Sequence, residues 1–567
     1  MLCAATEQPW VQKSNQNAQV LLAILARYAP EGAGSLGVSG LDEQISIPSA
    51  DLPAKSRRDV AGAIKVLQTR LTSETDPRIK QDLEILISAA ERANRESEAE
   101  ERHLLPYDNV ARTIFFGMHA LLDDQIAPER RPSAVVRLRR YTGVEQGYTP
   151  TTVLAEKLFR DKLNTPGLLG PAKAELEQDL AQMDQFVTGI GLLLEKYKMT
   201  NYQDAYAKLK EQLGEYRDFV RKEVLPHARS DFRLPPELYE INLINVGVDY
   251  TPDELMRLAH QSFTEIQGEM QTVAAKVAKE RNLPSSDYRD VIKALKKEQL
   301  KADQVMPLYH DRLAQIETII RREHLITLPE RPCIIRLASA AETAQQPAPH
   351  MVPPPLVNNH GERGQFVLPA GTIGPDGKPL KYDDFTFSAA AWTLTAHEAR
   401  PGHELQFDAM VERGVSQARG VFAANSTNIE GWGLYSEWFM LPYMPDEGKL
   451  ISLEARLLRA ARAFLDPELQ QGKLTPERAK QVLMNDVVAS EALATEEVDR
   501  YTFRLPGQAV SYFDGYTRLR EIRAAAEKAL GPKFDVQRFH DFILSQGMLP
   551  PSLLRKAVME DFIKQSS

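Results

Sequence analysis

The chain has 567 residues, of which 43% are hydrophobic and 26% are charged, and its net charge is −9. These values are typical of a globular protein with about two to four domains or one large lobed unit, and the negative charge argues against a nucleic-acid-binding surface. No run of about 18 apolar residues occurs, so we predict no transmembrane span. Cys3 and Cys333 are the only cysteines, which excludes a disulfide framework and a cysteine-rich zinc site.

Residues 11–335 are predicted to be mostly helical. Apolar residues recur at helical spacing in four stretches that prolines separate, namely 17–28, 52–95, 110–122 and 170–198. The segment Thr251–Glu254 predicts a helix start, because it offers a capping threonine, a proline at the first position and two acids in the first turn. We expect this helix to run to about Arg281.

Proline and glycine become frequent in the segment 340–381. Within it, residues 364–369 predict a short strand that ends at a proline. As an edge strand beside a metal-binding helix, it would hydrogen-bond an extended peptide, whereas the alternative is a surface loop with a minor hairpin. After Phe385 we expect helices to the end of the chain, with breaks near 442–445, 531–532 and 550–551.

Two histidines and an acid stand close together in the segment 397–403, which reads H-E-A-R-P-G-H. Two imidazoles and one downstream carboxylate are suitable protein ligands for Zn²⁺ and leave a fourth position for water. The downstream carboxylate is Glu430 or Glu437, which lie seven residues apart and on one helical face. The pattern therefore predicts a hydrolytic zinc site with one zinc ion per chain.

The six-residue spacing of His397 and His403 differs from the usual H-E-x-x-H motif, in which the histidines share one helical face. Six steps of about 100° would put His403 roughly 240° round an ideal helix, on the wrong face. Pro401 and Gly402 can interrupt the helix, because proline lacks the N–H and glycine adopts unusual backbone conformations. We predict a helix that ends near Arg400 and a second helix that begins at His403.

Two neighbours of the histidines have predicted roles. Glu398 follows a ligand by one residue and therefore points beside the metal, where it can act as a base on water; the alternative is a solvated helical acid. Gln406 lies one turn into the second helix and is a candidate partner for an imidazole N–H.

Four ordered motifs carry a resemblance to a known family. They are H-E-x-x-P-G-H-x-x-Q at 397–406, E-G-W-x-x-Y at 430–435, an acidic-Val-Asp-Arg-Tyr segment at 497–501, and P-G-Q-A-x-x-Y at 506–512. Through them the chain resembles a large bacterial family of unknown function, which is similar to gluzincin-type zinc peptidases. The resemblance spans most of the chain. It implies zinc, peptide hydrolysis and a mainly helical, zinc-peptidase-like architecture with a deep cleft.

The resemblance also bears on single residues. It places the third zinc ligand at Glu430, which leaves Glu437 as a residue behind the ligands or on the surface. His540 is matched in the family. Its role is open, and a structural role is at least as well supported as a catalytic one. Arg400 and Glu404 depart from the commonest family pattern, and we expect these departures to affect substrate preference more than metal binding.

Tyr512 is predicted to stabilise the oxyanion, because a phenol can donate to developing negative charge without being charged itself. Tyr516, four residues later on the same helical face, is a rival. The alternative for both is a tyrosine whose hydroxyl satisfies a buried partner. Arg500 is a candidate for binding a substrate carboxylate, and an ion-paired arginine is the alternative.

Together these features predict a zinc metallopeptidase that acts on a peptide substrate. We expect a helical N-terminal lobe at 1–240 and a helical catalytic lobe at 241–567, with 340–381 lining or covering the cleft. A zinc amidohydrolase for a non-peptide amide and a non-catalytic zinc-containing binding or scaffold protein are the alternatives. The scaffold is disfavoured because structural zinc sites usually have four protein ligands.

Location is a separate question. The start Met1–Ala5 is too short for a signal peptide, but it fits the trimmed remainder of one, and the family often carries export signals. We expect a periplasmic or secreted protein, with a cytoplasmic location as the alternative. Oligomeric state and the choice between end and internal cleavage stay open.

Overall fold

The computed structural model describes residues 8–369, 372–373, 379–380 and 382–566. The chain is mainly helical with a small sheet, as predicted. The start Met1–Ala5 and part of the proline- and glycine-rich segment, 374–378 included, lie outside the described residues. None of the helices that the structure describes combines the length and the apolar character that crossing a membrane requires.

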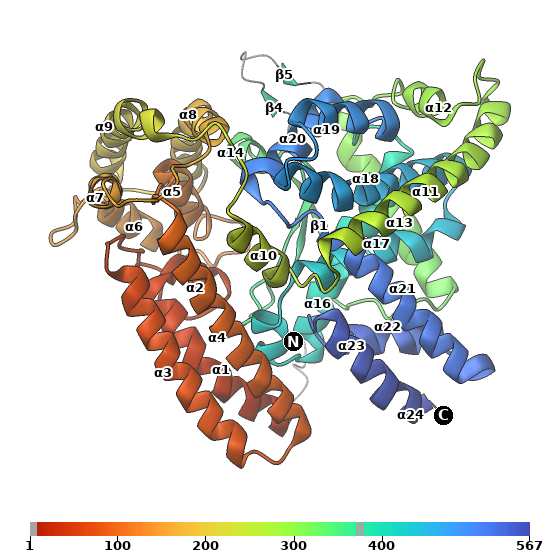
Figure 1. Ribbon diagram of the computed structural model, residues 1–567, viewed down its shortest axis with the longest axis horizontal. Helices are drawn as coiled ribbons and strands as arrows, with labels where there is room; N and C mark the ends of the chain where they lie inside the picture. The colour runs from red at the N-terminus through yellow and green to blue at the C-terminus, as the bar shows by residue number, and fades with distance from the viewer. Residues whose placement is uncertain (1–7, 370–371, 374–378, 381, 567) are drawn as a thin grey trace.

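The first part of the chain forms long antiparallel helices followed by a helical bundle, drawn in red to yellow in Figure 1. These elements are α1 (Pro9–Tyr28), α2 (Pro30–Ser35), α3 (Leu52–Ser73), α4 (Pro77–His103), α5 (Val110–His119), α6 (Ser133–Tyr141), α7 (Thr151–Lys162), α8 (Lys173–Lys196), α9 (Gln203–Phe219), η1 (Val220–Val224) and η2 (Leu225–His227). The predicted helical stretch 52–95 is divided at 74–76, because Asp76 caps a new helix by accepting a hydrogen bond from Arg78 N.

The middle of the chain contains α10 (Pro236–Asn245), α11 (Pro252–Arg281), α12 (Tyr288–Leu295), α13 (Ala302–Arg322) and α14 (Ala340–Gln345). The predicted helix start is confirmed, since the Thr251 side chain accepts a hydrogen bond from Glu254 N and α11 runs to Arg281. Some hydrophobic cores contain residues from both the N-terminal and the C-terminal parts of the chain. The predicted lobe boundary between residues 240 and 241 stays a prediction.

The remaining helices include the three that carry His397, His403 and Glu430. They are α15 (Ala390–Leu394), η3 (Thr395–Ala399), α16 (His403–Arg413), η4 (Ala418–Phe422), α17 (Ser426–Met440), η5 (Leu441–Tyr443), α18 (Asp446–Gln470), α19 (Pro476–Val482), η6 (Leu483–Val487), α20 (Glu491–Asp499), η7 (Arg500–Arg504), α21 (Ser511–Leu530), η8 (Gly531–Lys533), α22 (Val536–Ser545), α23 (Pro551–Ala557), η9 (Val558–Phe562) and α24 (Ile563–Ser566). The breaks at 442–445, 531–532 and 550–551 occur as predicted.

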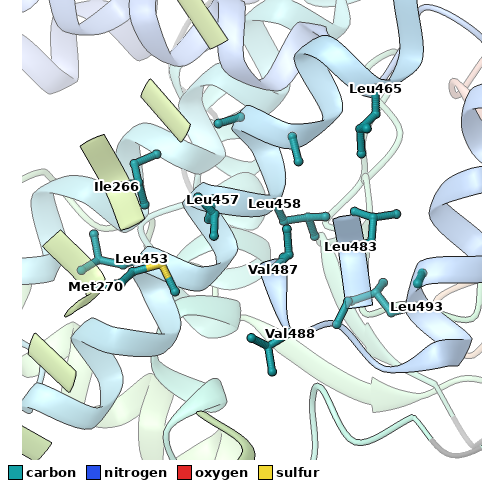
Figure 2. Close-up of a cluster of buried hydrophobic side chains, with 14 of the residues drawn as sticks. Ile266, Met270, Leu453, Leu457, Leu458, Leu465, Leu483, Val487, Val488 and Leu493 are labelled. Carbon is teal, nitrogen blue, oxygen red and sulfur yellow. The ribbon is translucent and has the colours of Figure 1, made fainter. Parts of the chain in front are cut away.

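The largest hydrophobic core fixes α18 in place. Ile266 and Met270 of α11 face Leu453 and Leu457 of α18, and Val487 of η6 lies beside them (Figure 2). These side chains are buried, and each contributes about 1.5–3 kcal/mol through removal of apolar surface from water. This packing sets the orientation of α18, whose arginines reach the candidate site.

A three-stranded sheet lies near the metal motif. It consists of β1 (Ile334–Leu337), β2 (His350–Val352) and β3 (Gln365–Leu368), in the order β1-β3-β2. The predicted strand is confirmed as β3, but its predicted edge position is wrong, because β1 pairs with it in parallel and β2 pairs with it antiparallel. The edge next to the candidate site is therefore β2. A separate two-stranded pair joins β4 (Thr372–Ile373) to β5 (Pro379–Leu380).

Helices α17 and α21 cross at two glycines. A Cβ atom on Gly515 would lie 1.9 Å from the carbonyl oxygen of Thr427, and one on Gly431 would lie 2.5 Å from the carbonyl carbon of Gly515. Only glycine permits so close an approach of the two backbones. The crossing brings Tyr512, at the start of α21, toward Glu430 on α17.

Candidate metal centre

The helix that carries His397 is interrupted before His403. Helix α15 continues into the π-helical turn η3, and Arg400 then adopts an extended conformation with φ −122° and ψ 135°. The Arg400–Pro401 peptide bond is cis, and α16 begins at His403. A Cβ atom on Gly402 would lie 1.9 Å from the carbonyl oxygen of His397, so glycine is required in this turn. The predicted interruption is confirmed.

Side chains of α17 satisfy the carbonyl groups that the interruption leaves without helical partners. Trp432 Nε1 donates to the carbonyl oxygens of Pro401 at 3.0 Å and of Gly402 at 3.3 Å. Ser436 Oγ donates to the Pro401 carbonyl oxygen at 3.3 Å. Because buried carbonyl groups need partners, these bonds explain how the E-G-W-x-x-Y motif stabilises the histidine motif.

Three ligand atoms converge on one point. Glu430 Oε2 lies 3.4 Å from His397 Nε2 and 3.2 Å from His403 Nε2. Four ligands arranged tetrahedrally at 2.0–2.1 Å from Zn²⁺ would be about 3.3 Å apart. Glu430 Oε2 is buried and has no hydrogen-bond partner among the described residues, which favours a cation at this point. The two imidazoles and this carboxylate therefore fit a zinc site.

Glu398 lies beside the same point. His397, Glu398 and His403 form a group whose ligand atoms lie within 4.8 Å of one another, so Glu398 is a rival ligand by proximity alone. Its Oε1 atom lies 4.0 Å from His397 Nε2, farther than Glu430 Oε2. The shorter distances from Glu430 to both imidazoles favour Glu430 as the ligand and leave Glu398 adjacent to it.

Glu437 orients His397 from behind. His397 Nδ1–H donates to Glu437 Oε1 at 2.7 Å, and the Thr393 hydroxyl donates to the other carboxylate oxygen. This bond fixes the ring so that Nε2 faces Glu430, the arrangement usual for a metal-bound histidine. On the remaining face, a Cβ atom on Gly433 would lie 2.6 Å from His397 Cε1, so the imidazole packs directly against α17. Glu437 is thus a buried partner and not a surface residue.

The candidate ligands change one another's pKa values. Burial lowers the pKa of His397, but the neighbouring carboxylates of Glu430 and Glu437 more than offset this effect and raise the pKa to about 9. Burial opposes ionisation of Glu430, yet the two imidazoles hold its pKa well below the usual range. The cluster therefore favours a positive charge at its centre, which is a proton or a metal ion according to metal supply.

Gln406 does not have its predicted partner. Its Nε2 donates to Asn428 Oδ1 at 2.9 Å. Its Oε1 atom and His403 Nδ1 are both buried and have no hydrogen-bond partner among the described residues. The predicted bond to an imidazole is not formed among the described residues, and Gln406 is held through its Nε2 by Asn428 of α17.

Of the two candidate tyrosines, Tyr512 lies in the site. Its ring is within 14° of parallel to the His397 ring, with 6.4 Å between centroids. Burial and the negative charge of Glu430 raise its pKa, so the phenol keeps its proton and can donate it in a hydrogen bond. The hydroxyl of Tyr516 accepts a hydrogen bond from Arg520 Nη1 at 2.7 Å, and its ring packs in a separate core. The predicted rival is therefore directed away from the metal centre.

A cavity of about 240 Å³ opens onto the candidate metal centre. It is lined by Glu398, Tyr512 and the three candidate ligands, and also by residues of the segment 346–353, which belong to the predicted cleft segment 340–381. A larger cavity of about 470 Å³, between residues 34–42 and 352–365, contains none of the candidate metal ligands.

Four other residues that line the cavity beside the candidate metal centre were not predicted to be functional. They are His350 on the edge strand β2, Arg459 and Arg462 on α18, and Glu497 on α20. Arg459 and Arg462, three residues apart among the apolar residues of α18, were the available signal, because buried guanidinium groups are rare without a partner. Arg500, which was predicted, lines the same cavity.

His540 has a structural environment. Its Nδ1–H donates to the Leu325 carbonyl oxygen at 2.8 Å, and its Nε2 accepts a hydrogen bond from the Tyr435 hydroxyl at 2.9 Å. It is fully buried, and this burial lowers its pKa to about 3. Of the two open roles, the contacts favour the structural one.

The two departures from the family pattern are partners of each other. Arg400 Nε and Nη2 donate to the two carboxylate oxygens of Glu404 at 2.7 and 3.0 Å, and Arg400 Nη1 donates to Glu317 at 2.7 Å. Neither Arg400 nor Glu404 is among the described residues that line the cavity. Their position does not support the expected effect on substrate preference.

Comparison with known proteins identifies the family and the fold. The family model described as "Bacterial protein of unknown function (DUF885)" matches residues 30–558, so the chain belongs to this family. No curated protein matches the sequence. The crystal structure of a candidate lipoprotein from Colwellia psychrerythraea is similar, with a TM-score of 0.75 and 16% identity over 97% of this chain and 99% of that chain. The structure of a candidate lipoprotein of unknown function from Shewanella oneidensis is also similar. Its TM-score is 0.69, with 18% identity over 98% of this chain and 100% of that chain.

Proposed function

We propose that this member of the bacterial family is a zinc-dependent hydrolase whose substrates are peptides. One observation carries the proposal. The unpartnered, buried Glu430 Oε2 lies 3.4 and 3.2 Å from two imidazole Nε2 atoms, at the separations that ligands of one zinc ion would have. A further carboxylate, Glu398, adjoins this group at the wall of a cavity.

Each residue of the centre has a distinct task in this proposal. His397, His403 and Glu430 would hold Zn²⁺, and the ion when bound supplies a Lewis acid that polarises a carbonyl group and acidifies water. Glu398 takes a proton from the attacking water and returns it to the leaving amine.

Two residues around this centre support the reaction. Tyr512 donates a hydrogen bond to the oxygen that becomes negatively charged as the carbonyl is attacked. Glu437 keeps His397 in the orientation that binding requires.

The edge strand favours peptides over other amides. His350 and Met351 of β2 line the cavity, and β2 is the edge of the sheet on this side. An extended peptide can add to such an edge through main-chain hydrogen bonds. The resemblance of the motifs to gluzincin-type peptidases supports the same substrate class. A non-peptide amide stays the alternative substrate. A purely structural zinc site is disfavoured, because three protein ligands and an adjoining acid leave one side of the centre open to the cavity.

We also propose that the protein is located outside the cytoplasm. The two similar structures are described as candidate lipoproteins, which supports export of this chain as well. Cell fractionation of the native bacterium, followed by immunoblotting, tests this part separately from the chemistry.

The function is tested by metal content and hydrolysis together. Purified protein should contain about one zinc per chain, and His403→Ala should lose most of it. Zinc-loaded protein, incubated with a mixed peptide library and read by mass spectrometry, should generate defined cleavage products. Glu398→Gln should keep its zinc and fold while losing most turnover, since an amide cannot accept the proton. Full zinc retention by His403→Ala, or near-normal turnover by Glu398→Gln, would contradict the assignment.

A further inference from the structure

Three arginines line the cavity that the candidate metal ligands also line. Arg459 and Arg462 project from α18, and Arg500 begins η7; we call them the arginine cluster. Their side chains are 11%, 7% and 16% exposed, so the cluster is largely withdrawn from bulk water. The Arg462 guanidinium lies 4.3 Å from the centroid of the Tyr512 ring, whose other neighbour is His397 at 6.4 Å between ring centroids.

The positive charge of the cluster exceeds the negative charge beside it. Glu497 accepts two hydrogen bonds from Arg462, at 2.7 and 2.6 Å, and lies 3.5 Å from Arg500 Nη1. Burial opposes ionisation of Glu497, but the two guanidinium groups lower its pKa to about 2, so it carries one full negative charge. Glu437 lies 3.7 Å from Arg459 and is already bonded to His397. Two carboxylates, Glu497 and Glu437, therefore face three guanidinium groups, in a chain whose net charge is −9.

Each arginine of the cluster also has an unused donor. The Nε atom of Arg459 and the Nη1 atoms of Arg462 and Arg500 are buried and have no hydrogen-bond partner among the described residues. Unpartnered buried donors are costly, and a planar guanidinium group matches a carboxylate with two parallel hydrogen bonds. A carboxylate that entered the cavity would meet both the excess charge and the guanidinium groups.

We propose that the arginine cluster binds a carboxylate of the substrate and so positions a peptide for cleavage near that carboxylate. The inference rests on the proposed peptidase function. Because the Tyr512 ring lies beside both Arg462 and His397, at 4.3 and 6.4 Å, an extended chain at about 3.5 Å per residue places the carboxylate within about three residues of the scissile bond. The carboxylate is either the C-terminus of the peptide or an acidic side chain, and the two sources can be separated.

Binding measurements test the cluster independently of turnover. Zinc-loaded Glu398→Gln protein is titrated by calorimetry with one short peptide in three forms: free acid, C-terminal amide ending in Gln, and C-terminal amide ending in Glu. A carboxylate bound by charged hydrogen bonds should improve affinity by about 10- to 100-fold over the Gln amide. Adding Arg500→Gln should remove most of this difference.

The matched control is Arg456→Gln. Arg456 lies one turn before Arg459 on α18, is 13% exposed and faces Glu269 at 3.8 Å, and it is not among the described residues that line the cavity. This variant should retain the preference for the carboxylate. Improved binding of the free acid identifies the C-terminus as the source, and improved binding of the Glu amide alone identifies the side chain.

The outcomes separate this inference from the proposed function. Equal affinity for all three peptides, no binding of any of them, or a preference that survives Arg500→Gln would overturn the carboxylate site. If the wild-type protein cleaved the acid and both amides at equal rates, the carboxylate site would be rejected and the peptidase function would stand. A clear carboxylate preference in binding, with no cleavage of any peptide, would instead reject the peptidase function and leave the site.

Discussion

Tyr512 and Tyr516 lie four residues apart on α21 but have different surroundings. The Tyr512 ring lies 6.4 Å from the His397 ring and lines the cavity, whereas the Tyr516 hydroxyl is bonded to Arg520. If Tyr512 stabilises the oxyanion, it acts mainly in the transition state. We expect Tyr512→Phe to lower kcat by about 100- to 1000-fold with little change in KM, measured on a peptide that the wild-type protein cleaves.

Tyr516→Phe is the control for this prediction, because it removes the same atom from the same helix outside the cavity. A large loss of rate in Tyr516→Phe with none in Tyr512→Phe would contradict the assignment. Small effects in both variants would assign the oxyanion to another donor of the cavity, for which His350 is the candidate.

His540 should make the stability of the fold sensitive to acid. Its pKa is about 3 in the folded protein because of burial, against about 6.5 for an exposed histidine. Between these values the unfolded chain binds a proton that the folded protein does not, so the free energy of unfolding falls as the pH falls. The slope approaches about 1.4 kcal/mol per pH unit once the pH is below about 6.5.

A neutral replacement, His540→Asn, tests this dependence. It should lower the free energy of unfolding at pH 7, because hydrogen bonds to Leu325 and Tyr435 are altered, and it should also flatten the pH dependence between 6.5 and 5. Urea titrations at a series of pH values measure both effects. Parallel pH profiles for the variant and the wild type would show that another group causes the acid sensitivity.

Residues close together in the sequence were the ones that spacing alone could assign. His397, Glu398 and His403 fall within seven positions, and the geometric conflict between the two histidines was enough to predict the helix interruption. Arg459 and Arg462 reach the same cavity through the packing of α18 against α11, which no local pattern specifies. Gln406 failed as a partner for the same reason, since Asn428 of another helix competes for its amide.

At the scale of the element, α17 serves as the wall against which the metal motif packs. Gly433 is the point of contact, because a Cβ atom there would lie 2.6 Å from His397 Cε1. Gly433→Ala should leave α17 helical, since alanine is the better helix former by about 1 kcal/mol. The methyl group should nevertheless displace the imidazole. We expect zinc content to fall while the far-ultraviolet circular dichroism spectrum is unchanged.

Gly268→Ala is the matched control for this change. Gly268 lies inside α11, and a Cβ atom there meets no atom within 4 Å. This variant should keep its zinc and gain about 0.5–1 kcal/mol of stability through helix propensity. Full zinc content in Gly433→Ala would show that the imidazole does not depend on close packing with α17.

The helices and strands themselves were easier to predict than the elements that pack beside them. The cap at Thr251 and the apolar period fix α11 locally, so both of its ends were predicted. The strand at 365–368 was also predicted, but its central position was not, because β1 and β2 join it from segments about 15 to 30 residues earlier. The order of strands in a sheet depends on tertiary contacts. The edge available to a ligand is therefore β2, and not β3 as the sequence had predicted.

At the scale of the whole molecule, the N-terminal helices are bonded into the part that carries the metal motif. Asp82 of α4 is fully buried and accepts hydrogen bonds from Ser14 Oγ and Ser416 Oγ, both at 2.6 Å, and from Arg419 Nε at 2.7 Å. Ser416 and Arg419 lie just beyond α16 and in η4. Similarly, Ile85 of α4 belongs to a core whose other buried residues all lie at position 316 or later.

Removing one partner of this buried pair should therefore affect the entire fold. Arg419→Met leaves the Asp82 carboxylate buried without its cation, which typically costs about 3–5 kcal/mol. The double variant Asp82→Asn/Arg419→Met also removes the unpaired carboxylate charge. It should recover a large part of the free energy of unfolding that Arg419→Met loses. Thermal unfolding followed by circular dichroism, together with zinc content before melting, measures the coupling. If Arg419→Met were no less stable than the double variant, the N-terminal helices would be packed against the part with the candidate metal centre without dependence on this ion pair.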